Sequence, residues 1–259
     1  MRGIVNPFHG RTPPIYCEAM ISDLWLTRHG ESIGNVAATT AEREGLDVIA
    51  IEERDADVPL STTGAEQAQA FGAWLADHDG GIGTAWVSPY LRAQQTLSLA
   101  MAESGSTLVP LVDERLRDRE LGVLDLLTRR GVERFHPEEA ERRRRLGKYY
   151  HRPPGGESWA DVALRLRSFL TDSIPAADGG ALIVAHDAVV LLLVSLLTAM
   201  NERELLDFAS ANTVLNASVT HLRRDGARWE MLAFSTVSHL QKEGADVTVH
   251  PGSPDVEPE

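Results

Sequence analysis

Two arginines and two histidines in this 259-residue sequence are of types that could together bind and transfer a phosphoryl group. Arg28 and His29 are adjacent and precede Gly30, whereas Arg92 and His186 lie far along the chain. A neutral imidazole can attack phosphorus, and guanidinium groups can bind the equatorial oxygens of the phosphoryl group in pairs of hydrogen bonds. Catalysis of this kind depends on positioning and on stabilising spread negative charge. The set therefore predicts phosphoryl transfer if the fold brings all four residues together.

Each of these residues also has an ordinary structural explanation. A histidine after a strand is more often a turn residue or a hydrogen-bonded core residue than a nucleophile. Arg92 falls in the first turn of an expected helix, where a cation is unfavourable against the helix dipole. An anion beside it would justify that placement, which favours phosphate binding. The nine histidines show no metal-ligand spacing, so the sequence does not predict a metal site.

The elements that must position these residues alternate between short apolar runs and helical patterns. Strands are expected at 24–27, 85–88, 107–112 and 181–185, and helices at 64–77, from Pro89 onward, at 158–170 and at 188–200. The pair 218–223 and 228–234 is expected to form a hairpin. This alternation indicates an α/β fold whose sheet is covered on both faces. Ligands of such sheets bind beyond the carboxyl ends of the strands, where the four residues would meet.

Two segments interrupt the alternation. Residues 37–59 are unusually acidic, and residues 118–156 form a cap-like insertion that contains the run Arg142 to Arg145. The arginines could lie on a solvated helix face and pair with Glu138, Glu139 and Glu141. Alternatively, the insertion could cover the active site and attract phosphate. Both explanations stay open, for different residues of the insertion.

Composition limits the partners and the location. The formal net charge of −13 argues against nucleic acid or an anionic membrane as the main partner. The single cysteine, Cys17, excludes a disulfide within a monomer. The longest apolar run, from Ala188 to Met200, is too short to span a bilayer, and the first twenty residues lack the features of a signal peptide. We expect a cytoplasmic protein that acts on a small phosphorylated metabolite, with a homodimer as the generic assembly.

The two ends of the chain differ in composition from the rest. Residues 1–20 are expected to be a flexible extension, because the first strong secondary-structure signal begins after Met20. Residues 241–259 are polar, rich in proline near their end and acidic, which predicts a disordered tail. A single domain over 21–240 remains between them.

Four blocks of sequence, in order, resemble the histidine phosphatase superfamily, in its phosphoglycerate-mutase-like branch. The blocks are Thr27-Arg28-His29-Gly30-Glu31-Ser32 with Asn35, Leu60-Ser61-x-x-Gly64-x-x-Gln67-Ala68, Ser88-Pro89-x-x-Arg92-Ala93-x-Gln95-Thr96, and Ala185-His186. The resemblance runs from about Ile21 to Leu240. It implies a three-layer α/β/α sandwich with a mostly parallel sheet and a phosphohistidine intermediate on His29. It also implies a phosphate pocket of Arg28, Arg92 and His186, and no metal or organic cofactor.

The general acid is where the sequence departs from the family pattern. The family carries a glutamate four residues before a glycine, and Asp118 stands at that position before Gly122. Glu120 is a rival, because it would lie on the same side of an extended chain. Asp187 stands where mutase-like members usually carry glycine and where the acid-phosphatase branch carries its proton donor. We favour Asp118 as the acid and a helix-capping role for Asp187.

The resemblance leaves more than one activity open. We favour a phosphatase, in which water accepts the phosphoryl group, with Asn35, Arg119 and Asp187 contacting the substrate. A phosphoglycerate-mutase-type phosphotransferase is the main alternative, but its additional substrate residues find no match within 118–156. A catalytically idle phosphate-binding scaffold on the same fold is the third possibility.

Overall fold

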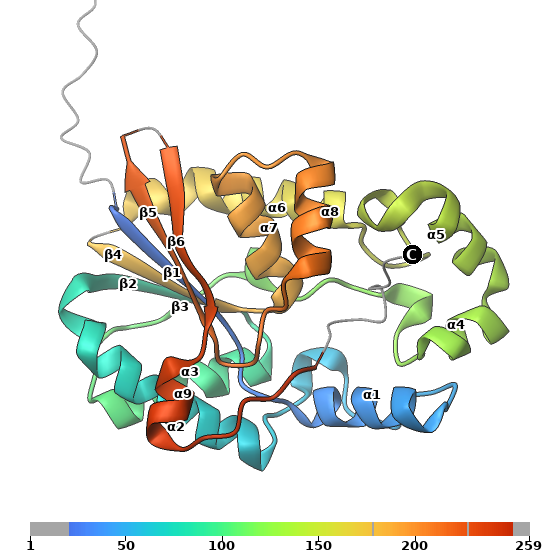
Figure 1. The fold of residues 1–259 in the computed structure, drawn as a ribbon, viewed down its shortest axis with the longest axis horizontal. Coiled ribbons are helices and arrows are strands. Elements are labelled where there is room, and N and C mark those ends of the chain that lie inside the picture. The colour runs from blue at the N-terminus through green and yellow to red at the C-terminus, as the bar shows by residue number, and fades with distance from the viewer. Residues whose placement is uncertain (1–20, 178, 227, 251–259) are drawn as a thin grey trace, which may run out of the picture.

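A six-stranded sheet forms the centre of the computed structural model, which describes residues 21–177, 179–226 and 228–250 (Figure 1). The strand order is β3-β2-β4-β1-β5-β6. The bounds are β1 (Asp23–Arg28), β2 (Ile82–Val87), β3 (Leu111–Val112), β4 (Gly180–Ala185), β5 (Val219–Asp225) and β6 (Arg228–Thr236). Strands β1 to β4 run parallel, and β5 and β6 form an antiparallel pair at one edge. The prediction of a mostly parallel sheet with a terminal hairpin is confirmed.

Helices cover both faces of this sheet and complete a three-layer α/β/α sandwich (Figure 1). On one face lie α2 (Thr62–His78), α3 (Leu91–Ser104) and α9 (Ser238–Glu243), and on the other lie α6 (Trp159–Asp172), α7 (Asp187–Leu197) and α8 (Glu202–Ala211). Three further helices extend beyond the carboxyl ends of the parallel strands: α1 (Ile33–Glu44), α4 (Arg129–Phe135) and α5 (Pro137–Tyr150). The last two belong to the segment 118–156.

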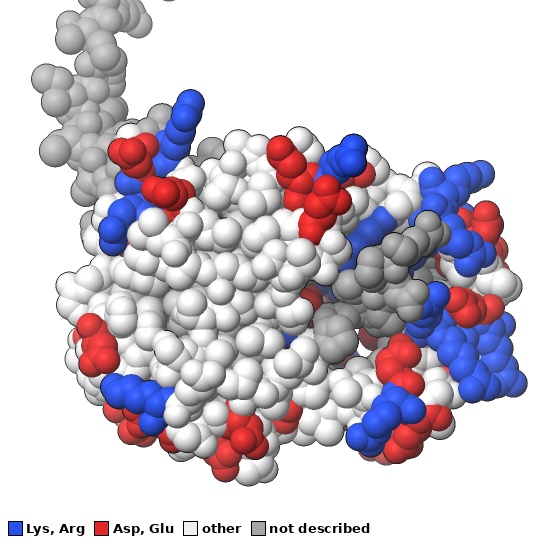
Figure 2. Space-filling model, in the orientation of Figure 1, with Lys and Arg blue, Asp and Glu red and all other residues white. Residues whose placement is uncertain are grey.

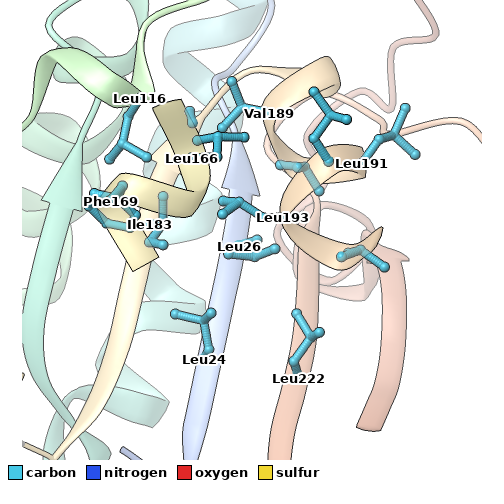
Figure 3. Packing of buried hydrophobic residues seen from close by; sticks show 14 of the residues in the cluster. Leu24, Leu26, Leu116, Leu166, Phe169, Ile183, Val189, Leu191, Leu193 and Leu222 are labelled. Carbon is cyan, nitrogen blue, oxygen red and sulfur yellow. The ribbon is translucent and has the colours of Figure 1, made fainter. Parts of the chain in front are cut away.

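The strands are buried on both faces because successive side chains point to opposite sides of a sheet. Leu24, Leu26 and Ile183 pack with α6 and α7 in the larger core (Figure 3). Trp25 and Leu182, one position along, pack with α2 and α3 in the second core. A continuous apolar run thus supplies side chains to the cores on both faces of the sheet. This packing fixes the positions of the strand ends that carry the reactive residues.

Local sequence signals explain several helix boundaries. Ser158 and Asp161 form the expected capping box at the start of α6. Helix α3 begins at Leu91 with Tyr90 as its N-cap, so Pro89 lies before the helix and not in its first turn. The predicted strand at 107–112 is paired only at Leu111–Val112, where it forms an exposed edge.

Residues 241–250 differ from the prediction of a disordered tail. After α9, the chain returns over α2, where the Gln67 side-chain amide donates to the Asp246 carbonyl at 2.8 Å and to the Thr248 hydroxyl at 2.9 Å. His250 ends the described chain in a buried position. Disorder was inferred from low apolar content, whereas this segment is held by polar contacts. The predicted extension at 1–20 and the remainder of the tail, 251–259, lie outside the described residues.

Candidate active site

His29 lies directly after β1 and is almost fully buried, with 3% of its surface exposed. Its Nδ1 donates to the Gly30 carbonyl at 2.7 Å, which leaves Nε2 as the unprotonated nitrogen. Burial lowers the pKa of His29 well below its usual range, and the neighbouring Arg92, His186 and Arg28 add to the effect. The imidazole is therefore neutral and carries its lone pair on Nε2.

Arg92 lies in the first turn of α3 and is the centre of the charged groups around His29. Its Nε lies 3.3 Å from His29 Nε2 and donates to it. Nη1 lies 2.9 Å from an Asp55 carboxylate oxygen, and Nη2 lies 3.0 Å from Oδ2 of Asp118. The two carboxylates outweigh burial and raise the pKa of Arg92. The anion expected beside this cation at a helix N-terminus is thus supplied here by aspartates.

His186 directly follows β4, is fully buried and serves as the N-cap residue of α7. Its Nε2 pairs with the Ser88 hydroxyl at 2.8 Å, and its ring centre lies 5.1 Å from that of His29. Among the residues that the structure describes, Nδ1 has no hydrogen-bond partner, although Asp118 lies 3.2 Å away. That nitrogen is available to a bound ligand.

Arg28, the last residue of β1, is held by two backbone carbonyls. Its Nη1 donates to Val214 at 2.7 Å and to His250 at 2.9 Å. Burial lowers its pKa from the usual value, although an arginine remains charged under all ordinary conditions. The structure therefore brings Arg28, His29, Arg92 and His186 together, and we call these four residues the phosphate centre.

The loop after His29 depends on two glycines that touch each other. A Cβ added to Gly64 would lie 1.9 Å from the Glu31 carbonyl oxygen, and one added to Gly30 would lie 2.5 Å from the Gly64 carbonyl oxygen. Neighbouring side chains complete the support, because Thr96 accepts from the Gly30 amide and Gln67 accepts from the Glu31 amide. Only glycine permits this approach of the α2 N-terminus to the loop.

Asp118 is a carboxylate that lies beside two residues of the phosphate centre. Besides its contacts with Arg92 and His186, its Oδ1 accepts from the Arg119 amide at 2.8 Å. Burial alone would raise the pKa of Asp118, but His186 and Arg92 outweigh it and hold the pKa well below its usual range. With no anion bound, Asp118 is ionised.

Asp55 is a second carboxylate at the centre, and it was not among the residues predicted from the sequence. It lies in the acidic segment 37–59, and both its side chain and its carbonyl oxygen accept from Arg92. Burial raises the pKa of Asp55 despite the nearby arginine, and the charge of Asp118 raises it further. Asp55 is thus the more easily protonated of the two.

Glu120, the predicted rival acid, points elsewhere. Its carboxylate accepts from the Tyr90 hydroxyl at 3.1 Å, and about half of its side chain is exposed. It does not line the cavity at the phosphate centre. The prediction assumed an extended chain, but 3₁₀ turns at Glu114–Leu116 and Gly122–Leu124 flank an irregular loop, so residues two apart do not share a side.

The three expected substrate residues all line this cavity, but each has a structural contact as well. Asn35 completes the capping box of α1 with Ser32. Arg119 donates from Nε to the Glu157 carbonyl at 2.7 Å. Asp187 is the first residue of α7 rather than its N-cap, and its carboxylate accepts from the Ala188 amide. The prediction that Asp187 caps α7 is therefore wrong, because His186 occupies the N-cap position and, within the described residues, no side chain caps the helix there.

The cavity has a volume of about 500 Å³ and extends from the phosphate centre toward the insertion. Its walls come from α1, the segment 49–58, the loop 118–129, and the N-terminal turns of α6 and α7. Lys148 of α5 also reaches it, with Nζ 4.4 Å from the centre of the Trp159 ring. The cavity is much larger than a phosphate group needs, so the site has room for a sizeable substrate.

The arginine run of α5 lies on the surface and does not line the cavity. Figure 2 shows Lys and Arg gathered over the α4–α5 side of the molecule. Arg142 pairs with Glu139, and Arg144 pairs with Glu141. Arg142 and Arg144 therefore lie on a solvated helix face, whereas Arg119, Arg129 and Lys148 supply the positive charge of the insertion that reaches the cavity.

A family model described as the histidine phosphatase superfamily (branch 1) matches residues 24–236. The chain belongs to the histidine phosphatase superfamily. Among its relatives, a 2,3-bisphosphoglycerate-dependent phosphoglycerate mutase of Methylobacterium radiotolerans is 31% identical over 206 residues, covering 76% of this chain and 91% of the relative. Another protein of that name, from Sinorhizobium fredii, is 30% identical and covers 85% of this chain and 100% of its own length.

Solved structures give the same fold with phosphatases among them. A mycobacterial glucosyl-3-phosphoglycerate phosphatase is 26% identical, with a TM-score of 0.65 over 83% of this chain and 100% of that one. The alpha-ribazole phosphatase of Shigella flexneri, at 21% identity, supports the fold alone, with a TM-score of 0.67 over 83% and 96% of the two chains. The chain thus resembles both mutases and phosphatases.

Several residues that support the site were present in the sequence blocks without an assigned role. Ser88 binds His186, Thr96 and Gln67 hold the loop after His29, and Gln95 accepts from the Leu60 amide. Their positions in the blocks were the available signal. No comparable signal pointed to Asp55 or His250, because each reaches the site from an irregular segment.

Within the described ranges, no three histidine, cysteine or acidic side chains are grouped to hold a metal ion, and no helix is long and apolar enough to cross a membrane.

Proposed function

We propose that this protein is a phosphatase that hydrolyses a phosphate monoester of a small molecule through a phosphohistidine on His29. The observation that carries the proposal is the hydrogen bond from Nδ1 of His29 to the Gly30 carbonyl at 2.7 Å. It fixes the tautomer in which Nε2 carries a lone pair, and Nε2 faces Arg92. A neutral, oriented imidazole is what nucleophilic attack on phosphorus requires.

In the first step, Nε2 of His29 forms a bond to phosphorus while the bond between phosphorus and the alcohol oxygen breaks. Arg92, Arg28 and Nδ1 of His186 are placed to bind the other phosphoryl oxygens, with the guanidinium groups supplying charge-assisted hydrogen bonds. The arriving dianion would replace Asp55 and Asp118 as the partner of Arg92. Binding therefore exchanges one set of anions for another and leaves no buried cation unpaired.

The leaving alcohol oxygen must receive a proton, and we assign this role to Asp118. Its carboxyl is ionised because Arg92 and His186 stabilise the charge. A bound phosphate engages both partners and adds negative charge nearby, so the pKa of Asp118 rises on binding. In the second step, Asp118 takes a proton from the water that attacks phosphorus, and the bond to Nε2 breaks. Asp55, which shares Arg92, is the alternative donor.

The mutase alternative takes support from the relatives that are named phosphoglycerate mutases. A mutase returns the phosphoryl group from His29 to another oxygen of the substrate and must therefore exclude water from the intermediate. The wide cavity beside the phosphate centre favours hydrolysis, because it leaves room for water next to His29.

Release of inorganic phosphate tests the proposal. The purified protein is incubated with 4-nitrophenyl phosphate and a panel of phosphorylated metabolites, with and without a chelator. We expect phosphate release that persists in chelator and that falls by more than about a thousandfold in His29→Ala. Isomerised product without phosphate release would select the mutase, loss of activity on chelation would overturn a metal-free reaction, and complete inactivity would leave the phosphate-binding scaffold.

A further inference from the structure

The cavity beside the phosphate centre is lined in large part by apolar side chains. Six of them come from four separate parts of the chain: Ile51 and Val58 from the acidic segment, Leu121 and Leu126 from the loop after Asp118, Trp159 from α6 and Leu191 from α7. We call the part of the cavity that these six side chains line the apolar chamber. Burial of a substrate group against such a wall is favourable in proportion to the apolar area removed from water.

The two irregular walls of the chamber are fastened to each other. The Ile49 amide donates to the Leu126 carbonyl at 2.8 Å, and Val48 and Leu127 form an isolated antiparallel bridge. The Thr128 amide donates to the Asp47 carbonyl at 3.2 Å. The chamber is therefore a joined structure rather than two loops that happen to lie near each other.

Leu126 is held in a backbone conformation that disfavours a leucine. Its φ of +56° lies in the left-handed region, which costs a residue with a side chain about 1–2 kcal/mol relative to ordinary backbone. The surrounding hydrogen bonds impose this conformation, and the leucine side chain lines the cavity. A strained residue that presents an apolar side chain to a pocket indicates that the wall serves a ligand.

The charges of the chamber do not favour a second anionic group on the substrate. Three cations lie beyond the phosphate centre, namely Arg119, Arg129 and Lys148, and each already has a partner. Three carboxylates line the same region: Glu42, Glu53 and Asp125. A second phosphate or a carboxylate placed there would approach as many negative charges as positive ones.

Resting on the proposed phosphatase activity, we propose that the substrate is a monophosphate ester of a bulky, largely apolar alcohol without a second anionic group. The phosphoryl group would occupy the phosphate centre, and the alcohol would occupy the apolar chamber. This class is distinct from the small, doubly anionic phosphoglycerates, whose carboxylate would find no net positive charge in this region.

Three esters of primary alcohols test the substrate class, because their leaving groups are similar: 2-phenylethyl phosphate, glycerol 3-phosphate and 3-phosphoglycerate. We expect kcat/KM for 2-phenylethyl phosphate to exceed that of either other ester by at least about tenfold, mainly through a lower KM. Ile51→Asn, outside any helix or strand, should lower this preference by about tenfold through a loss of kcat/KM for 2-phenylethyl phosphate. Leu164→Asn, at an exposed position of α6 outside the cavity, is the matched control and should preserve the preference.

The affinities of the His29→Ala variant for the same three esters, measured by calorimetry, separate this proposal from the phosphatase itself. Tighter binding of 2-phenylethyl phosphate supports the apolar substrate class, whether or not the wild-type protein hydrolyses the esters. If the wild-type protein hydrolyses none of the three, the proposed phosphatase activity is overturned, and the binding result still stands. Equal or tighter binding of 3-phosphoglycerate overturns the apolar substrate class, and so does an equal or higher kcat/KM for that ester. If the substrate class is overturned but the wild-type protein still hydrolyses these esters, the proposed phosphatase activity is supported.

Discussion

The phosphate centre and the apolar chamber share one cavity but are built differently. At the phosphate centre, His29 and His186 directly follow adjacent parallel strands of the sheet, and their positions are set by backbone pairing in its core. In the chamber, much of the wall comes from irregular segments that are joined by a few backbone hydrogen bonds. The reaction thus depends on the phosphate centre and the choice of substrate on the chamber. The irregular walls of the chamber can vary in sequence without moving the groups that bind phosphate.

Replacing Arg92 should have the largest effect on catalysis after loss of His29 itself, because Arg92 contacts His29, Asp55 and Asp118 together. We expect Arg92→Ala to lower kcat/KM by about a thousandfold for every ester, apolar or polar. Arg92→Lys should recover little, since an ammonium group lacks the planar fork. Steady-state kinetics with the three primary-alcohol esters provide the measurement.

The control for Arg92 is Arg223→Ala on β5, which removes an exposed ion pair with Asp23. It should change kcat/KM by less than about twofold, as expected for a surface pair. If Arg92→Ala instead shifted the ratio between esters, the division between the phosphate centre and the chamber would be wrong.

Asp118→Asn should lower kcat by about a hundredfold on alkyl esters and much less on 4-nitrophenyl phosphate, whose leaving group needs no proton. Asp55→Asn is the matched variant, because both aspartates bind the same guanidinium. If Asp55→Asn shows the leaving-group dependence and Asp118→Asn does not, Asp55 is the proton donor. The comparison thus sharpens which carboxylate belongs to the chemistry of the centre.

Much of the phosphate centre could be predicted from sequence because apolar runs and the residues that follow them are contiguous. Leu24–Thr27 gave a strand, and the position of His29 after it followed directly. The register of β1 against β4 then sets His29 and His186 side by side, and parallel strands make this predictable. The family blocks added Arg92 at the start of α3.

The remainder of the site depends on chain directions that no local pattern encodes. The direction of Glu120 follows from an irregular loop between two 3₁₀ turns, so the alternation of an extended chain did not apply. Asp55 reaches Arg92 from a segment without periodicity. The segment up to His250 is ordered by polar contacts with Gln67, Glu31 and Arg28, which composition does not reveal.

His250 offers a milder test of the phosphate centre. Its Nε2 pairs with Glu31 at 2.6 Å, its Nδ1 pairs with the Thr39 hydroxyl at 2.7 Å, and its carbonyl accepts from Arg28. His250→Ala keeps the carbonyl but releases the segment that positions it. We therefore expect KM to rise about tenfold for all esters, with a smaller change in kcat. Lys242→Ala, at an exposed position of α9, is the control and should leave both constants unchanged.

The pH dependence of stability should also report on the centre. Burial lowers the pKa of His29 below its ordinary value of 6.5, so the unfolded chain binds more protons than the folded one in the range just below that value. The contribution of His29 to stability is complete above pH 6.5 and is lost as the pH falls toward its folded pKa. His29→Asn should flatten this part of the curve. Urea titrations of both proteins between pH 5 and 8 provide the measurement, and identical curves would contradict a buried neutral histidine.

Leu126 and Leu127 allow the smallest and most specific test, because both line the cavity but only Leu126 has a positive φ. Leu126→Gly loses the stabilisation that comes from the leucine side chain. It also removes the backbone strain, because glycine adopts the left-handed region freely, and this offsets part of the loss. Leu127→Gly loses its side chain without this compensation. We expect the free energy of unfolding to fall by about 1 kcal/mol less in Leu126→Gly than in Leu127→Gly, as measured by urea denaturation.

Both variants should lose part of the preference for 2-phenylethyl phosphate while keeping kcat/KM for glycerol 3-phosphate. A general loss of activity in either variant would show that the chamber wall also supports the phosphate centre, and the two regions would then be one.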